Sequence, residues 1–443
     1  MKKIIFITVV DGFHYRYLID TGIVDNILNT TNSNLHIFTI ESLVYKLEEK
    51  YKDDNNVYIY TLVQFKSNIF TKMYLKKKQL SNIKLAGTLN IKSENQKDIS
   101  IVKKFLLKII PFSFLESYFI SMYYRNLISK LTPDLIILST PSQKPLDYYL
   151  AYEANRANIK VVSPVYSWDN LTAKGPFYFD INYLIVWNKI MQEEAIHYHG
   201  YTSSNCFIAG VPVFDIYASM LDKEKEEKEG FFNKLNLDNN KKLITITTIP
   251  QIYFGSHHNT LIDKIRNYII EGNLKIQILV RPHPMDETDY SKWNDDSIVK
   301  LDYYGSKPDS SLINWNPQKN NTRHLGLTMK YSNVVINIAS TITIDAACFN
   351  TPIINIAYDM KRDDSDYTGS IKRYYQYTHY KHVVTTNAAK LVYSDKDLFK
   401  TILLYIENPN LGTKERKLLV EKQTNMLDGK STKRISRIIN DII

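Results

Sequence analysis

Four short stretches of the sequence combine residues that suit anion binding or acid–base chemistry. The first is VRPHP at 280–284, which ends an apolar run typical of a buried strand. Arg281 presents a planar fork of donors that matches phosphate, and His283 can donate to a phosphoryl oxygen near neutral pH. The two prolines fix the turn. This pattern predicts an anion site where the strand ends, with a salt-bridged loop as the ordinary structural alternative.

The second stretch, NVVINIASTITIDA at 333–346, predicts a strand that runs into the start of a helix. Ser340 and Thr341 lie where the helix should begin, and the N–H groups and partial positive charge of a helix start receive phosphate readily. Asp345 lies one turn further along, where its carboxylate could accept from a sugar hydroxyl. Ser340 could equally serve as an N-cap.

The third stretch, SWDNLTAKG at 167–175, also follows a strand-like run. Trp168 could stack on a ring, Asp169 could act as a base, and Lys174 could meet an anion. Asn170 lies in the same loop, and we group it with this acceptor-binding set. The structural alternative is an Asx-type loop packed by the tryptophan.

The fourth stretch, DGFHYR at 11–16, follows the first strand-like run. The carboxyl ends of parallel strands meet at one edge of a sheet, so Asp11 and His14 should lie near the same opening as SWDNLTAKG. Asp11 is therefore a second candidate for the general base.

Strand-like and helix-like runs alternate along the chain, which predicts parallel α/β sheets. The strand-like runs are nearly continuous in apolar residues, as in sheets covered on both faces. They lie at 3–10, 35–41, 56–62, 134–140, 160–167, 183–188, 205–213, 242–249, 275–280, 333–339 and 352–359. The helix-like runs lie at 145–158, 189–200, 259–271, 395–407 and 413–441. A charge-rich stretch at 221–242 separates two such series and indicates a linker.

The composition bounds the class of protein. Of the 443 residues, 44% are hydrophobic, so the chain can bury sizeable cores. Cys206 and Cys348 lie in apolar runs, which favours buried thiols in a reducing compartment over a disulfide. No apolar run reaches the roughly 20 residues that span a bilayer. The opening run at 1–10 is interpreted as a buried strand rather than a signal peptide, and we expect a cytoplasmic protein.

The net charge of +10 suits a polyanionic partner, such as a phosphorylated small molecule, an anionic membrane or a nucleic acid. The segment 97–125 combines apolar bulk with Lys103, Lys104 and Lys108, so peripheral contact with the inner face of the cell membrane is an option. A helix that covers the core is its alternative. The tyrosine-rich run at 373–380 could stack on bases, but tyrosine is abundant throughout, so nucleic-acid binding is the least favoured class.

In their order and spacing, these stretches resemble a GT-B glycosyltransferase of the bacterial surface-polysaccharide type, and in particular CDP-glycerol glycerophosphotransferase-like proteins. The resemblance covers roughly residues 130–443. The matching pieces are SWDNLTAKG, GVPVFD (210–215), RPHP, ASTITIDA with NTPIIN, YIENPN (405–410) and DGKSTKRI (428–435).

The resemblance implies two Rossmann-like, doubly wound parallel-sheet domains that face each other across a cleft. The expected divisions are 1–215 as an N-terminal acceptor domain, 216–241 as a charged linker, 242–425 as a C-terminal nucleotide-donor domain, and 426–443 as a C-terminal helix that can cross back to the N-terminal domain.

For the donor domain, the resemblance implies that Arg281 and His283 face the donor diphosphate or the leaving phosphate, with His283 also counted among the catalytic candidates. Ser340 and Thr341 would hold the phosphate at the helix start, and Asp345 would lie on the sugar side.

For the acceptor domain, the resemblance implies a general base among Asp169 and Asp11. The remaining acceptor-side candidates are His14, Trp168, Asn170 and Lys174. The transfer would need neither a metal nor a cofactor, because fixed cations and N–H groups can stabilise the leaving phosphate. The nucleotide-activated donor is a substrate.

The leading hypothesis is a glycosyltransferase that moves a sugar from a nucleotide to a glycan or lipid-linked acceptor in capsule or other cell-surface polysaccharide synthesis. The first alternative is transfer of a polyol phosphate from a CDP-activated donor. The loop 247–259 departs from the polymerising enzymes, since His257 and His258 come several residues late. A sugar-nucleotide 2-epimerase is a third option, although few carboxylates are available for it. The donor sugar, the base, the acceptor and the stereochemical outcome stay open.

Overall fold

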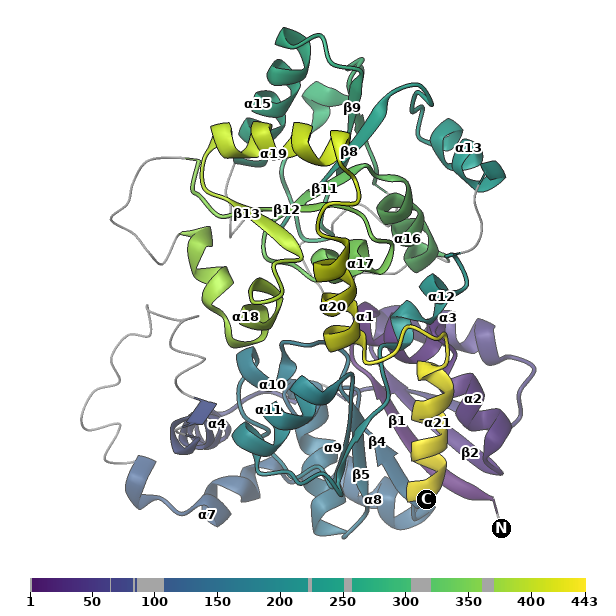
Figure 1. The fold of residues 1–443 in the computed structure, drawn as a ribbon. Helices are drawn as coiled ribbons and strands as arrows, with labels where there is room; N and C mark the ends of the chain where they lie inside the picture. The colour runs from purple at the N-terminus through teal and green to yellow at the C-terminus, as the bar shows by residue number, and fades with distance from the viewer. Residues whose placement is uncertain are drawn as a thin grey trace. The chain divides into compact units, whose positions relative to one another are not determined.

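The computed structural model describes residues 2–63, 65–82, 84–85, 107–221, 225–250, 257–303, 320–360 and 370–443. The chain divides into two compact units. Unit 1 comprises Met1–Pro212 with Lys430–Ile443, and unit 2 comprises Val213–Gly429. Each unit holds one sheet with helices between successive strands (Figure 1). All described strand pairs are parallel, which confirms the predicted α/β class.

Unit 1 is built on a seven-stranded sheet in the order β3-β2-β1-β4-β5-β6-β7. Its strands are β1 (Lys3–Val9), β2 (Ser33–Thr39), β3 (Val57–Thr61), β4 (Leu135–Ile137), β5 (Val161–Pro164), β6 (Tyr183–Val186) and β7 (Cys206–Ile208). Its helices are α1 (Gly12–Tyr15), a π-helix (Arg16–Asp20), α2 (Ile23–Thr30), α3 (Glu41–Tyr51), α4 (Ile69–Ser81), α7 (Phe112–Glu116), a 3-10 helix (Ser117–Phe119), α8 (Met122–Leu131), α9 (Pro145–Arg156), α10 (Asn170–Ala173), α11 (Lys189–His199) and α21 (Ser431–Ile442).

The strand order of unit 1 reverses between β1 and β4, and this switch point decides where a ligand can enter. Loops that leave adjacent strands in opposite directions open a crevice at the carboxyl ends of those strands. The loop after β1 carries Asp11 and His14, and the loop after β4 carries Thr140. The strands beneath are fully buried, as at Ile5 and Ile137, so the loops sit on a rigid base.

The last helix, α21, belongs to unit 1 although it follows unit 2 in the chain. It packs beside α2 (Figure 1), where Thr432 donates to the carbonyl of Thr21 at 3.3 Å. The side chain of Arg434 donates to the carbonyl of Ala209 at 2.7 Å. The helix-like run at 413–441, which overlaps the C-terminal helix expected at 426–443, comprises two helices.

The helix-like run is split into α20 (Thr413–Thr424) and α21 by a turn in which Asn425 and Gly429 have φ values of 63° and 71°. The left-handed region that these residues occupy ends a helix and favours glycine or asparagine. The chain passes from unit 2 back to unit 1 immediately after this turn, between Gly429 and Lys430.

We expect Gly210→Ala to lower the free energy of unfolding by about 1–3 kcal/mol, because overpacking a tight contact costs about that much. Gly210 has a φ of 89°, and a Cβ atom there would lie 2.6 Å from Oγ of Ser431 in α21. Urea unfolding measures the change. The matched control is Gly230→Ala, where a Cβ would meet nothing within 4 Å. That helical substitution should raise stability by about 0.5–1 kcal/mol, and equal effects at both sites would contradict the proposed contact.

Unit 2 is built on a six-stranded sheet in the order β10-β9-β8-β11-β12-β13. Its strands are β8 (Lys242–Thr247), β9 (Ile276–Arg281), β10 (Val299–Leu301), β11 (Val334–Asn337), β12 (Ile353–Ile356) and β13 (Ala389–Val392). Its helices are α12 (Asp215–Ala218), α13 (Lys225–Lys234), α15 (His257–Glu271), a 3-10 helix (Ser291–Trp293), α16 (Asn321–Tyr331), α17 (Ile342–Cys348), a 3-10 helix (Ile371–Gln376), α18 (Thr378–Val384), α19 (Asp395–Glu407) and α20; a 3-10 turn (Pro212–Phe214) lies at the boundary between the units.

Helix α13 corrects the expected linker at 216–241. Phe231 and Phe232 of this helix are buried against Leu243 and Leu279 of the sheet. Because charged residues surround this apolar pair in the sequence, the pattern predicted a linker and not a packed helix. The residues of α13 are therefore an integral part of unit 2.

Two further predictions concern cysteines and membranes. Cys206 and Cys348 are both buried and unpaired, as the apolar runs around them predicted. Within the described ranges, no helix has the length and apolarity needed to cross a membrane.

Candidate active site

At the switch point of unit 1, Asp11 and His14 form a hydrogen-bonded pair. Asp11 caps α1 by accepting from the backbone N–H groups of Phe13 and His14. Its Oδ1 atom also lies 2.6 Å from Nδ1 of His14. Burial alone would raise the pKa of Asp11, but the charge and hydrogen bonds of His14, with Lys144 at 3.9 Å, hold it below its ordinary value. Asp11 is therefore an ionised carboxylate that orients the imidazole.

His14 is fully buried, and its ring packs edge-on against Tyr166 with centroids 4.2 Å apart. Since Nδ1 carries the proton that Asp11 accepts, Nε2 of the neutral ring is an acceptor. This Nε2 atom is buried and has no hydrogen-bond partner among the described residues. An Asp–His pair with an unused ring nitrogen is chemically able to accept a proton.

Asp147 at the start of α9 is a functional candidate that sequence reasoning missed. It is fully buried, Thr140 donates to its Oδ2 atom, and its Oδ1 atom has no partner in the described part of the chain. Burial raises the pKa of Asp147 to about 6, although hydrogen bonds from Thr140 and Thr8 and the charge of His14 oppose the rise. The sequence signal that could have pointed to Asp147 is its position in the first turn of a helix that follows a loop at the switch point.

The SWDNLTAKG loop lies after β5, beside the Asp11–His14 pair. Two of its predicted residues are packing residues here. Trp168 is 5% exposed, so its ring face is covered. Asn170 is buried, accepts from the N–H of Ser167 at 3.1 Å and donates to Gln143 at 3.1 Å. These contacts pack Trp168 and tie Asn170 to the fold of the loop, and the predicted ring stacking of Trp168 and acceptor contact of Asn170 stay predictions.

Asp169 and Lys174 keep polar atoms at the surface of the same loop. Oδ2 of Asp169 pairs with Nζ of Lys174 at 3.0 Å, and Oδ1 accepts from the hydroxyl of Ser167 at 2.7 Å. The Asp169 side chain retains 19% of its exposure and that of Lys174 retains 40%. The two predicted segments are brought together around Tyr166, whose pKa is raised by burial and is also affected by the charges of Lys174, Asp169 and Asp11.

Glu194 on α11 is a second residue that the sequence did not single out. Burial, and next the negative charge of Asp169, raise the pKa of Glu194 to about 8. A buried carboxyl that stays protonated at neutral pH can act as a proton donor. Its proximity to Asp169 could not be foreseen, because the two residues lie on separate elements.

We expect the stability of the protein to fall as pH rises from about 5 to 8, and Glu194→Gln to reduce that fall. The unfolded chain releases the proton near the ordinary value of 4.5, whereas the folded chain holds it up to about 8. Between these values the folded state binds more protons, so the native protein loses up to about 1.4 kcal/mol per pH unit relative to the variant. Thermal unfolding at several pH values measures this. Glu193→Gln, at an exposed neighbour on α11, is the control. Parallel profiles for the native protein and Glu194→Gln would refute the assignment.

In unit 2, Arg281 ends β9 and is held in a fixed orientation. Its Nη1 atom donates to Asp302 at 2.6 Å and its Nη2 atom donates to Asn321 at 3.1 Å. Asp302 in turn lies 2.9 Å from Nε2 of His324. Burial would raise the pKa of Asp302, but the hydrogen bonds and charges of His324 and Arg281 outweigh it and lower the pKa. A guanidinium anchored on an ionised carboxylate is pre-oriented for a second anion.

His283 lies two residues beyond Arg281, and its tautomer is set by the backbone. The N–H of Met285 donates to Nδ1 of His283 at 3.0 Å, so the proton of the neutral ring resides on Nε2. The backbone N–H of His283 donates to the hydroxyl of Thr248 at 2.8 Å, which ties this turn to the loop after β8. The ring is thereby prepared to act as a donor through Nε2, as a phosphate site requires.

The helix-start residues after β11 are arranged partly as predicted. Thr341 is the N-cap residue of α17, without a side-chain cap, and Oγ of Ser340 accepts from the N–H of Ile342 at 3.2 Å. Helix α17 has only seven residues, so its dipole contributes less than the sequence suggested. Asp345 is 4% exposed and accepts from the Tyr217 hydroxyl at 2.7 Å. These contacts bury Asp345 against Tyr217, and its predicted contact with a sugar stays a prediction.

The histidines after β8 were noted as a departure from the family pattern, and the structure describes only part of that loop. Residues 251–256 lie outside the described ranges. His258 is buried in α15 and its Nε2 lies 2.9 Å from the carbonyl of Ile249, so it is a structural residue. In the described ranges, no three His, Cys, Asp or Glu side chains are grouped as metal ligands.

Comparison with known protein families shows to which family the chain belongs. A family model described as CDP-Glycerol:Poly(glycerophosphate) glycerophosphotransferase matches residues 154–441, more than half of the chain. The chain belongs to this family. The matched region contains the SWDNLTAKG loop, Arg281, His283 and Ser340, so the resemblance inferred from those motifs is confirmed. The family is one of transferases, which supports an enzymatic role. No curated protein matches the chain in sequence.

Solved structures with the same fold include members of several activities. UDP-GlcNAc 2-epimerase from Methanocaldococcus jannaschii is 13% identical, with a TM-score of 0.55 over all of both chains. The wall teichoic acid polymerase TagF is 13% identical, with a TM-score of 0.51 over all of this chain and 89% of its own. A glycosyltransferase from Rickettsia africae is 12% identical, with a TM-score of 0.51 and coverage of 100% and 97%. At these identities the similarity shows the fold alone, and it confirms the predicted GT-B-like class of two α/β domains.

Proposed function

We propose that the chain transfers a polyol phosphate from a CDP-activated donor to a hydroxyl of a cell-surface polymer. In this reaction the acceptor oxygen attacks the phosphorus atom next to the polyol, and a new O–P bond forms. The bond between that phosphorus and the oxygen that joins it to CMP breaks, and CMP leaves with the electron pair. The acceptor proton passes to a base on the enzyme. The proposal assigns neither a metal nor a further cofactor to these steps.

The anchoring of Arg281 is the observation that carries the proposal. The leaving nucleotide gains negative charge as its bond to phosphorus breaks, and fixed cations and donors stabilise that charge. Arg281 is held by Asp302 and Asn321, and His283 presents a proton on Nε2 two residues away. Ser340 follows β11, the strand that adjoins β8 at the switch point of unit 2. We assign these three residues to the donor phosphates.

Asp169 is our choice for the base that accepts the proton of the acceptor hydroxyl. It is partly exposed, and Ser167 and Lys174 fix both of its oxygens. A base must reach the substrate, and the Asp11 carboxylate is 4% exposed and engaged with His14 and the start of α1. Asp11 and His14 therefore fit a positioning or proton-holding role better than that of the first acceptor of the proton.

Transfer of a sugar from a nucleotide sugar is the second candidate. The fold is shared with a Rickettsia glycosyltransferase, and the same cation set would stabilise a nucleoside diphosphate leaving group. The family match favours the polyol phosphate instead. A 2-epimerase is less favoured, because the structural similarity to epimerases, at 10–14% identity, supports only the fold.

A thermal-shift screen tests which donor the protein binds. A ligand that prefers the native state raises the unfolding midpoint, by an amount that grows with its concentration relative to Kd. We expect CDP-glycerol to raise the midpoint more than UDP-GlcNAc, GDP-mannose or a dTDP-sugar. Arg281→Ala should reduce the shift. A shift with nucleotide sugars alone would replace the proposal with the glycosyl transfer alternative, and no shift with any of these ligands would count against both.

We propose that the molecule that receives the transferred group is a lipid-linked or growing glycan. Contact with an anionic membrane would bring the enzyme to this acceptor. The segment 97–125, which the structure describes from residue 107, has three well-exposed apolar side chains: Ile109 is 60% exposed, Phe114 is 48% and Met122 is 59%. Lys103 and Lys104 lie outside the described residues. Exposed apolar residues of this kind support, together with the net charge of +10, a location at the inner face of the membrane.

Sedimentation with vesicles tests this membrane contact. Vesicles with about one third phosphatidylglycerol should bind the protein, and Phe114→Ser with Met122→Ser should reduce binding. Tyr45→Ser, at a residue 77% exposed on α3, is the matched control. Equal binding by all variants would rule out this surface.

A further inference from the structure

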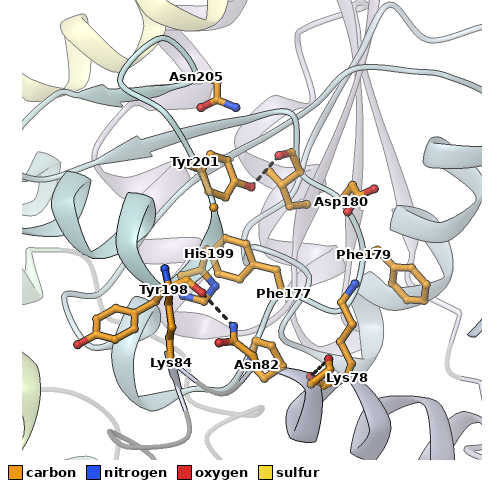
Figure 2. Close-up of a pocket in the computed structure, with 14 residues that line it drawn as sticks. Lys78, Asn82, Lys84, Phe177, Phe179, Asp180, Tyr198, His199, Tyr201 and Asn205 are labelled. Carbon is orange, nitrogen blue, oxygen red and sulfur yellow. Dashed lines mark hydrogen bonds between the residues drawn. The ribbon is translucent and has the colours of Figure 1, made fainter. Parts of the chain in front are cut away.

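Unit 1 contains a cavity whose lining includes none of the residues assigned to the proposed reaction. It has a volume of about 610 Å³ and is bounded by the end of α4, the segment 176–181 before β6, and residues 198–205 between α11 and β7 (Figure 2). Residues that precede parallel strands lie at the amino edge of the sheet. The cavity is therefore open at a different edge from Asp169, which follows the carboxyl end of β5.

The charge of this cavity favours an anion with one or two phosphates. Lys78 and Lys84 line one side, and Asp180 is the acidic residue among the described lining residues (Figure 2). His199 also lines the cavity but is neutral at physiological pH, because burial lowers its pKa to about 4. A modest positive balance suits a phosphodiester better than a triphosphate, which would need more cations.

The other walls suit a polyhydroxy ligand. Phe177 stacks on His199 with ring centroids 4.0 Å apart and planes 9° from parallel, so each ring covers one face of the other and holds it in place at the cavity border. Aromatic surface of this kind packs against the C–H groups of a polyol or a sugar. Asn82 and Asn205 add amide groups to the lining, and the side chain of Asn82 is fixed by donating to the carbonyl of Tyr198 at 2.9 Å. The volume lies in the range of small-molecule sites.

One contact links this cavity to the SWDNLTAKG loop. Nε2 of His199 donates to the carbonyl of Leu171 at 2.8 Å, and Leu171 lies in α10, two residues after Asp169. A ligand that packs on the Phe177–His199 pair therefore touches the side chain that supports the helix next to the proposed base.

We infer that this cavity binds a polyol phosphate segment through Lys78 and Lys84, as a holding site for part of the acceptor chain. The acceptor role rests on the proposed function, whereas the binding chemistry does not. The same chemistry could come from two sources, a chain of glycerol phosphate units or free glycerol 3-phosphate. A chain would extend along the protein and gain affinity from each further unit that meets a lysine.

Calorimetric titration of the full chain tests the inference, with a short synthetic glycerol phosphate oligomer, glycerol 3-phosphate and glycerol as the three probes. We expect the oligomer to bind. The double variant Lys78→Gln with Lys84→Gln should weaken it at least fivefold. Ser81→Trp, at an exposed lining residue, should block the cavity without a change in charge. Lys72→Gln is the matched control, since Lys72 lies on the same helix but not in the lining.

The outcomes separate the sources and the hypotheses. If the oligomer binds more tightly than glycerol 3-phosphate, the ligand of the site is a chain of glycerol phosphate units. If the two bind equally, the ligand is free glycerol 3-phosphate. Unchanged affinity in the double variant and in Ser81→Trp would overturn the inference, as would equal binding of glycerol or no binding of either phosphate probe. The thermal shift with CDP-glycerol is measured on the same variants. If the native protein shows no shift with CDP-glycerol, the proposed function fails but binding in the cavity can still be measured. The two failures are therefore distinguishable.

Discussion

Arg281→Ala is expected to lower kcat by about 10²–10³-fold, the usual cost of removing one preorganised donor from a developing negative charge. The substitution removes the group that Asp302 and Asn321 hold in place. Arg281→Lys should recover only part of the rate, because an ammonium keeps the charge but lacks the planar fork. Initial rates of nucleotide release at saturating donor measure the effect.

The matched control for Arg281 is Arg266→Ala, which breaks a similar ion pair in the same unit. Arg266 donates from Nε to Asp296 at 2.6 Å, as Arg281 does from Nη1 to Asp302 at the same distance. We expect the control to keep kcat within about twofold, since surface pairs contribute little. Equal losses in both variants would mean that Arg281 acts through stability, and a near-normal rate in Arg281→Ala would remove VRPHP from the site.

Asp169→Asn is expected to lower kcat by about 10²–10⁴-fold, the range for loss of a general base. The amide keeps the shape of the side chain but cannot take the acceptor proton. The donor-induced thermal shift should be unchanged, because we assign donor binding to unit 2. Steady-state kinetics should show a lower kcat with an unchanged donor KM. The acidic limb of the pH–rate profile should disappear.

Asp25→Asn is the control for Asp169, because Asp25 pairs with Lys50 at 2.8 Å on the same unit, as Asp169 pairs with Lys174 at 3.0 Å. We expect it to be active. If Asp169→Asn keeps most of its rate and Asp11→Asn loses it, the base belongs to the Asp11–His14 pair, and Asp169 is not the base.

Most strands could be predicted from the sequence because they are continuous apolar runs, as KIIFITV in β1 and KLITIT in β8 show. The strands that were missed lie at the edges of the unit 2 sheet. Strand β10 is the three residues VKL, and β13 is AKLV. An edge strand is covered on fewer sides, so its residues need not be apolar, and a lysine in each one masked the pattern.

The candidate site residues were predicted from their positions at the carboxyl ends of strands, and the structure places them there. Arg281, His283, Asp11 and Asp169 were each found by that rule. Their partners were not, because partners come from elements far apart in the chain. Asp302 supports Arg281 from a segment 21 residues on, and no local pattern marks it.

For two of the predicted site residues, the structure shows burial that the sequence did not display. Trp168 and Asp345 are 5% and 4% exposed. Sequence reasoning placed them at the right loop and helix, but it could not show whether a neighbouring side chain, such as Tyr217 against Asp345, would occupy the polar atoms. Burial depends on contacts between distant segments, which a single sequence does not display.

The identity of the nucleotide released from CDP-glycerol tests the central claim most directly. The purified chain is incubated with CDP-glycerol and a glycerol phosphate oligomer, and the products are separated by anion-exchange chromatography. The account predicts CMP in step with growth of the oligomer by one phosphate per turnover, and about 10²–10³-fold slower formation of both products with Arg281→Ala. CDP-glycerol left intact, while a nucleotide sugar in a parallel incubation releases a nucleoside diphosphate, would contradict it.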